Sequence, residues 1–188
     1  MREAAMLEGG FAAPATDAAR AFRAVMEAMA RPGTIHEVTG AAPPAPLSVA
    51  AGVALLTLCD SDTPLHLAGP ADTDAVRAWI AFHTGAPLTG PGDAMFALGR
   101  WADLGPLSAY PAGTPDYPDR SATLIVESDR LEARGARLSG PGIRESAVLS
   151  LPETGAFRAN AALYPMGLDF LFTCGGRIAA LPRSTRVD

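Results

Sequence analysis

The sequence predicts one domain of the α/β class, a three-layer α/β/α sandwich built around a mixed β-sheet. Apolar helices alternate with short strands whose two faces are both apolar, a pattern typical of a sheet covered by helices on each side. Near the C-terminus, two apolar runs flank Gly175-Gly176, which favours a hairpin and therefore at least one antiparallel strand pair. The 188 residues, 48% of them hydrophobic, suffice for a single compact core. Residues 1–188 are expected to form this domain, with residues 1–15 as a flexible N-terminal segment.

The first expected element is an amphipathic helix that starts at Thr16-Asp17. Apolar residues recur every three or four positions along it until Arg31-Pro32-Gly33 ends the pattern. Residues 34–38 are then expected to form a strand, and the proline-rich residues 42–46 continue neither element. Ser48 is placed to cap a second helix, which is apolar on most faces and reaches about Leu58.

The remaining elements alternate between strands and helices. Asp72 is expected to cap a third helix that ends near Gly85. A fourth helix is expected over residues 153–163. Strands are expected at residues 64–68, 94–98, 122–127, 137–139, 168–173 and 178–181.

Composition excludes several classes of function. Fifteen basic and twenty acidic residues give a net charge of −5, whereas a nucleic-acid-binding protein needs a basic face. Every basic residue is arginine, so the chain has no lysine for a pyridoxal phosphate Schiff base, a Walker-type phosphate loop or a kinase-like site. We therefore expect no nucleic-acid partner and no such cofactor.

Cysteine and histidine are too widely spaced to indicate a metal site. Cys59 and Cys174 are expected to be buried free thiols, because no paired spacing suggests zinc or a redox dithiol. His36, His66 and His83 form no helical HxxxH pair. Neither a signal peptide nor a run long enough to span a bilayer is evident, so we expect a cytoplasmic protein without membrane contact.

Two groups of residues are candidates for a functional site. Asp60 and Asp62 lie in one turn, where a carboxylate can act as a base or bind a cation, although aspartates are also ordinary turn formers. Arg183 and Arg186 are expected to leave the end of a strand, where guanidinium groups can bind a phosphate or a partner's carboxylate. Ion pairing within the chain is the alternative role for these arginines.

Five stretches together resemble one protein family in the same order along the chain. They are residues 22–33 (FRAVMEAMARPG), 55–64 (LLTLCDSDTP), 82–87 (FHTGAP), 138–143 (LSGPGI) and 164–186 (YPMGLDFLFTCGGRIAALPRSTR). Each stretch alone is weakly specific, but jointly they resemble the phosphonate-metabolism family PhnH, subunits of the bacterial carbon–phosphorus lyase system. The resemblance runs from about residue 17 to residue 187 and fades over residues 105–118 and 127–137.

The resemblance implies a fold similar to that of pyridoxal-phosphate-dependent transferases, without the cofactor. It also implies an accessory, non-catalytic subunit that works with subunits of the PhnG, PhnI, PhnJ and PhnL types. Such a complex couples a phosphonate to the ribose of ATP, giving ribose 1-phosphonate 5-triphosphate, with the chemistry mainly in the PhnI-type neighbour. We expect the terminal hairpin and the outer helices to bind a PhnG-like partner, and isolated chains to pair as homodimers.

Two other functions stay open at this point. One is an autonomous nucleotide- or phosphonate-binding enzyme that uses Asp60, Asp62 and Arg183. The other is a regulator that binds a small molecule on the same fold, which no residue pattern specifically favours.

Overall fold

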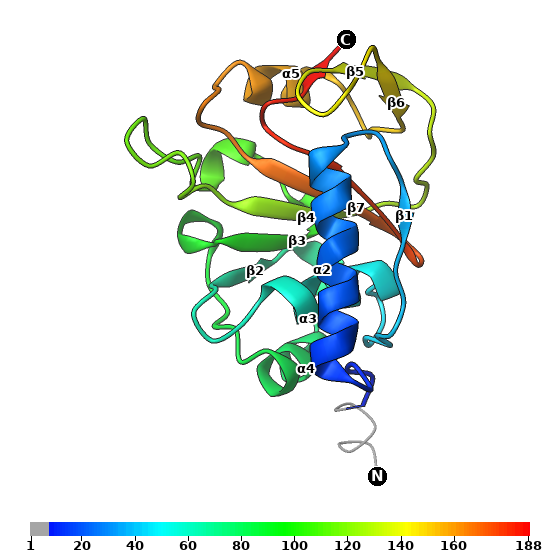
Figure 1. Ribbon diagram of the computed structural model, residues 1–188. Helices are drawn as coiled ribbons and strands as arrows, with labels where there is room; N and C mark the ends of the chain where they lie inside the picture. The colour runs from blue at the N-terminus through cyan, green and yellow to red at the C-terminus, as the bar shows by residue number, and fades with distance from the viewer. Residues whose placement is uncertain (1–7) are drawn as a thin grey trace.

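The computed structural model describes residues 8–188 and contains a large mixed β-sheet (Figure 1). Its six strands are β1 (His36–Glu37), β2 (Leu65–Leu67), β3 (Phe96–Arg100), β4 (Thr123–Glu127), β7 (Asp169–Cys174) and β8 (Arg177–Leu181). Their order across the sheet is β1-β8-β7-β4-β3-β2. Strands β2, β3, β4 and β7 run parallel, whereas β8 is antiparallel to both β7 and β1. The predicted mixed sheet and its C-terminal hairpin are therefore confirmed.

Successive residues of the central strands point into two cores, one on each face of the sheet. On β4, Ile125 lies in one core and its neighbours Leu124 and Val126 lie in the other. On β7, Leu171 lies in the first core and Phe170 in the second. Each of these side chains is at most 1% exposed. Burial on both faces explains why the strand sequences are apolar throughout rather than alternating with polar residues.

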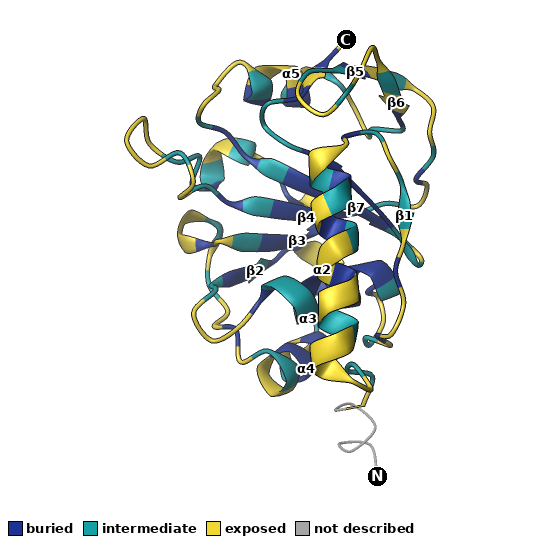
Figure 2. Cartoon of the chain, viewed as in Figure 1, coloured by how far each residue is buried: buried dark blue, intermediate teal, exposed yellow. Residues whose placement is uncertain are grey.

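Three helices cover the first face of the sheet, and they are α2 (Pro14–Ala30), α3 (Val49–Leu58) and α4 (Asp74–His83). Residues 50–55 of α3 are all buried, which fits the uniformly apolar sequence of this helix. Helix α2 is amphipathic instead: it buries Ala21, Val25 and Ala28, and its outer side is exposed along its length (Figure 2). The predicted helical layer is therefore present on this face.

The second face is covered differently from the predicted helical layer. It carries one short helix, α5 (Gly155–Ala161), and a small antiparallel sheet in the order β6-β5-β9. The strands of this sheet are β5 (Ala136–Ser139), β6 (Ala147–Leu149) and β9 (Arg186–Val187). Short 3-10 turns complete the chain, and they are η1 (Gly69–Ala71), η2 (Pro91–Asp93), η3 (Trp101–Asp103) and η4 (Leu107–Ala109). Strands β6 and β9 were not expected, because two or three residues give too little periodicity to detect.

Three of the four predicted helix starts differ from the observed ones, and the fourth helix, expected from residue 153, begins at Gly155. Ser48 caps α3 as expected, since its hydroxyl accepts a hydrogen bond from the Ala51 amide at 3.2 Å. Helix α2 begins earlier than predicted, at Pro14, a residue whose fixed φ suits the first helical turn. Helix α4 is capped by Thr73 rather than by Asp72, whose carboxylate is instead paired with Arg77.

The part of the N-terminal segment that is described is anchored against α4. The indole nitrogen of Trp79 donates a hydrogen bond to the Glu8 carbonyl at 3.0 Å. Gly10 lies so close to His83 that a Cβ atom there would be 2.5 Å from the imidazole ring. A flexible segment was predicted for residues 1–15, and residues 1–7 of that segment lie outside the described residues. Among the described helices, none is long and apolar enough to cross a membrane.

Candidate functional site

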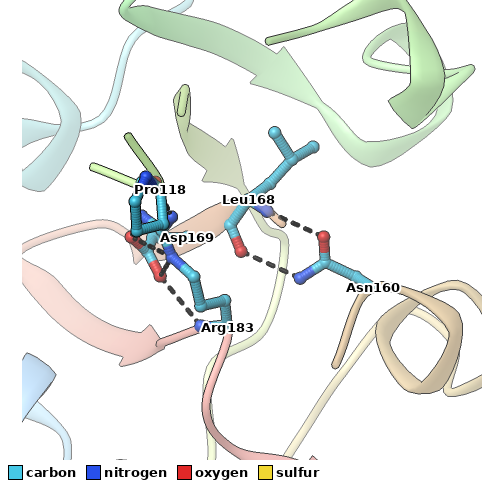
Figure 3. Close-up of polar contacts among 5 residues, drawn as sticks. All are labelled: Pro118, Asn160, Leu168, Asp169 and Arg183. Atoms are coloured by element: carbon cyan, nitrogen blue, oxygen red, sulfur yellow. Dashed lines mark hydrogen bonds and ion pairs between the residues drawn. The ribbon is translucent and has the colours of Figure 1, made fainter. Parts of the chain in front are cut away.

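Arg183 lies beside the start of β7 and forms an ion pair inside the protein (Figure 3). Its Nε atom is 3.2 Å from each carboxylate oxygen of Asp169, and its backbone amide donates to Asp169 Oδ1 at 2.8 Å. The guanidinium group also donates to the Pro118 carbonyl. The side chains of Arg183 and Asp169 are only 15% and 14% exposed. Of the two roles considered for Arg183, this geometry is that of ion pairing within the chain.

Asp60 and Asp62 lie in the turn that joins α3 to β2. The Asp60 carboxylate accepts a hydrogen bond from the Asp62 amide at 2.8 Å, and the Thr63 hydroxyl donates to the Asp60 carbonyl at 2.8 Å. These are the contacts of a turn-forming aspartate. This turn precedes β2, whereas Arg183 lies beside the start of β7. Two strands, β3 and β4, lie between β2 and β7, so these two strands are about 14 Å apart. The structure does not bring Asp60, Asp62 and Arg183 together.

Arg186 belongs to β9 rather than to a chain segment that leaves the sheet. It lies opposite Ser139 of β5 and is exposed, whereas the next residue, Val187, is buried. Its side chain is therefore on the outer face of the small sheet.

The cysteines and histidines are dispersed in the fold as well as in the sequence. Cys59 is buried, and burial raises the pKa of its thiol to about 12, so the thiolate form is strongly disfavoured. Cys174 is half-buried and free. Within residues 8–188, no three histidine, cysteine or acidic side chains come together in a group that could hold a metal ion. A pyridoxal phosphate cofactor does not fit either, because the chain has no lysine to bind it.

Glu127 is a polar residue of the sheet that the sequence analysis did not single out. It is the last residue of β4, where its carboxylate accepts hydrogen bonds from the Ser48 amide at 2.6 Å and the Thr173 hydroxyl at 3.1 Å. It thereby binds the N-terminal end of α3, where a negative charge is favoured by the helix dipole. Burial nevertheless raises the pKa of this carboxyl group, and the hydrogen bonds and Arg100 oppose that shift.

A cleft of about 350 Å³ opens beside Glu127 at the carboxyl ends of β3 and β4. Arg100, Asp129, Arg130 and Ser150 are among the residues that line it. Ligands of open α/β sheets bind at this edge, so its location alone makes the cleft the best candidate for a binding site. The signal available in the sequence was the position of Glu127 at the end of one predicted strand and of Arg100 two residues after the end of another.

The raised pKa of Glu127 predicts a specific pH dependence of stability. In the unfolded chain this group has its ordinary pKa of 4.5, whereas the folded protein retains the proton to higher pH. Its contribution to the free energy of unfolding is therefore largest below pH 4.5 and is lost as the pH rises through the folded-state pKa. We expect the wild type to lose stability relative to Glu127→Gln over this range, as measured by chemical denaturation at a series of pH values.

The control for this prediction is Glu37→Gln, which removes an exposed carboxylate from β1. Its stability difference from the wild type should vary much less with pH. If the stability difference between Glu127→Gln and the wild type stayed constant with pH, or changed in the opposite direction, burial would not be the cause of the raised pKa of Glu127.

Comparison with known proteins adds the identity of the family. Residues 9–188 match the family described as bacterial phosphonate metabolism protein (PhnH). The chain is 40% identical over 191 residues to the alpha-D-ribose 1-methylphosphonate 5-triphosphate synthase subunit PhnH of Rhizobium meliloti (strain 1021), covering 96% of this chain and 94% of the relative. It is also 30% identical over 179 residues to the putative C-P lyase subunit protein HtxG of Stutzerimonas stutzeri, covering 89% of this chain and 84% of the relative. This chain therefore belongs to the PhnH family of bacterial phosphonate metabolism proteins.

Proposed function

We propose that this chain is an accessory subunit of a carbon–phosphorus lyase-type complex that acts on organophosphonates. The relative from Rhizobium meliloti is a subunit of a ribose 1-methylphosphonate 5-triphosphate synthase, and it aligns with 96% of this chain. That near-complete alignment is the observation that carries the proposal. In this role the chain supports the transfer of the ribose triphosphate part of ATP to a phosphonate and leaves bond making and breaking to a neighbouring subunit.

The arrangement of the polar residues supports an accessory role over an autonomous enzyme. Arg183 is neutralised by Asp169, and Asp60 caps a turn on another part of the sheet edge. An enzyme that used these residues on one bound triphosphate would need them within a few ångströms of one another. The autonomous nucleotide- or phosphonate-binding enzyme is therefore not favoured.

We place the partner-binding surface on the outer helix α2 rather than on the terminal hairpin. Strands β7 and β8 are almost entirely buried, so the hairpin offers a partner little more than its turn. On the exposed side of α2, Phe22 and Met26 are 48% and 55% exposed and lie one helical turn apart. Exposed apolar side chains grouped in this way are typical of protein interfaces.

The same proposal includes the identity of the partners, the oligomeric state, the location in the cell and the similarity of the fold to known proteins. The partners are subunits of the PhnG, PhnI, PhnJ and PhnL types, with a PhnG-like subunit as the direct contact, and the isolated chain pairs as a homodimer. The protein acts in the cytoplasm, and its fold is similar to that of pyridoxal-phosphate-dependent transferases.

Co-expression with the neighbouring subunits tests this function. We expect the tagged chain to purify together with at least one of them. The double variant Phe22→Ser/Met26→Ser should lower the recovered partner severalfold, because the apolar contact area is lost. Phe82→Ser is the matched control, since Phe82 is 61% exposed at the end of α4 and should leave recovery unchanged. Equal recovery with all variants would contradict the assignment of the surface to α2.

A further inference from the structure

The cleft beside Glu127 adjoins a second cavity, with which it shares lining residues. The second cavity, of about 310 Å³, shares Arg130 and Ser150 with the cleft and continues it toward the start of β5. Three arginines line the two cavities, Arg100 in the first, Arg130 in both and Arg134 in the second. We call these joined cavities the arginine groove.

The arginines of the groove face solvent and are incompletely paired. Arg100, Arg130 and Arg134 are 62%, 62% and 63% exposed. Arg100 lies 3.6 Å from a carboxylate oxygen of Asp129, which is itself 90% exposed, and Arg130 lies 3.7 Å from Glu132. These distances exceed those of hydrogen bonds, so guanidinium donors stay available. Arg134 contacts the same Glu132 carboxylate, so one negative charge is shared by two arginines.

The other carboxylates near the groove are already bound by donors of the protein. Glu127 accepts from the Ser48 amide and the Thr173 hydroxyl. Glu153 accepts from the Trp101 indole nitrogen at 3.0 Å and from the Ala156 amide at 3.2 Å. Oxygen atoms of both carboxylates are thus occupied by donors of the protein, and the free donors of the groove belong to its arginines.

The backbone that carries Arg130 is held in place. Leu131 is fully buried and anchors the segment in the second core. The Ser150 hydroxyl accepts from the Glu132 amide at 2.9 Å, and the Ser150 amide donates to the Glu132 carbonyl at 2.9 Å. A fixed backbone reduces the entropy that would be lost when the arginines close on a ligand.

We propose that the arginine groove binds an elongated anion that carries several phosphate groups. One phosphate lies between Arg100 and Arg130, displacing the loose contact with Asp129, and a second lies at Arg134. Guanidinium groups favour phosphate because their paired N–H donors match its oxygens, and the shared cavities provide room for more than one phosphate.

Isothermal titration of the isolated chain with tripolyphosphate tests this proposal. We expect tripolyphosphate to bind more tightly than inorganic phosphate and more tightly than hexaglutamate, which offers carboxylates instead. Arg130→Gln should weaken tripolyphosphate binding by roughly tenfold or more, since a hydrogen-bonded charged contact is lost. Arg100→Gln should also weaken it.

Arg20→Gln is the matched control, because Arg20 forms a similarly loose pair with Asp17 at 3.9 Å on α2, outside the groove. Its affinity should stay within twofold of the wild type. The proposal would be overturned if Arg20→Gln weakened tripolyphosphate binding as much as Arg130→Gln does, or if Arg130→Gln kept both its thermal stability and its affinity for tripolyphosphate. It would also be overturned if hexaglutamate bound more tightly than tripolyphosphate, or if tripolyphosphate did not bind. These measurements use the chain alone, so their outcome is independent of whether it purifies with other subunits.

Discussion

Replacing Arg183 with alanine is expected to lower the free energy of unfolding by about 3–5 kcal/mol, because it leaves the largely inaccessible Asp169 carboxylate without its charged partner. The guanidinium group also joins β7 to the loop that carries Pro118, so that link is lost as well. Urea denaturation followed by circular dichroism measures the change. An arginine that served mainly to bind a ligand would show almost no loss of stability when replaced.

Two further variants separate the charge effect from general disruption. Arg186→Ala removes the nearby exposed arginine and should change stability by no more than about 0.5 kcal/mol. The double variant Asp169→Leu/Arg183→Met removes both charges and should recover much of the stability that Arg183→Ala loses. If the double variant were as unstable as Arg183→Ala, the unpaired Asp169 carboxylate would not be the cause of the loss.

Replacing Asn160 with alanine is expected to lower the free energy of unfolding by about 2–6 kcal/mol. The Asn160 amide accepts from the backbone N–H of Leu168 at 2.8 Å and donates to its carbonyl at 2.9 Å (Figure 3). Asn160 is only 7% exposed and Leu168 is 2% exposed, so alanine leaves two buried backbone groups unpaired at about 1–3 kcal/mol each. Thermal and urea unfolding of the purified variant measure the loss.

A conservative variant at this position and a control at the preceding residue test the same cause. Asn160→Asp keeps the shape but replaces the donor with a carboxylate oxygen facing the Leu168 carbonyl, and should therefore be destabilised as well. Ala159→Ser alters the preceding residue of α5, which is exposed, and should be near neutral. A stability loss below 1 kcal/mol for Asn160→Ala would show that water replaces both hydrogen bonds.

The sequence predicted the mixed sheet and most of its elements because each of these elements is specified by residues that are close together in the chain. The β7–β8 hairpin follows from two apolar runs around Gly175-Gly176, and α3 follows from Ser48 and the apolar run after it. Its prediction of a helical layer on both faces was only half right. Strand β9 pairs with β5 from a distant part of the chain, and β6 pairs with β5 across a short loop. Two or three residues carry no signal of such pairing.

The roles of the candidate site residues were less predictable, because these residues contact partners that are far away in the sequence. The pairing of Arg183 with Asp169 joins residues 14 positions apart through the register of β7 and β8. Glu127 reaches Ser48 across 79 positions, and nothing in the local sequence indicates that contact. Sequence patterns could therefore name Arg183 as important but could not decide between binding a ligand and pairing within the chain.

Purification of the tagged chain after co-expression with the neighbouring subunits, followed by measurement of particle mass, tests the accessory role most directly. We expect a defined complex that contains this chain, and formation of the ribose phosphonate product by that complex but not by the chain alone. A chain that stays free of every neighbour and forms the product unaided at the rate of the full mixture would contradict it.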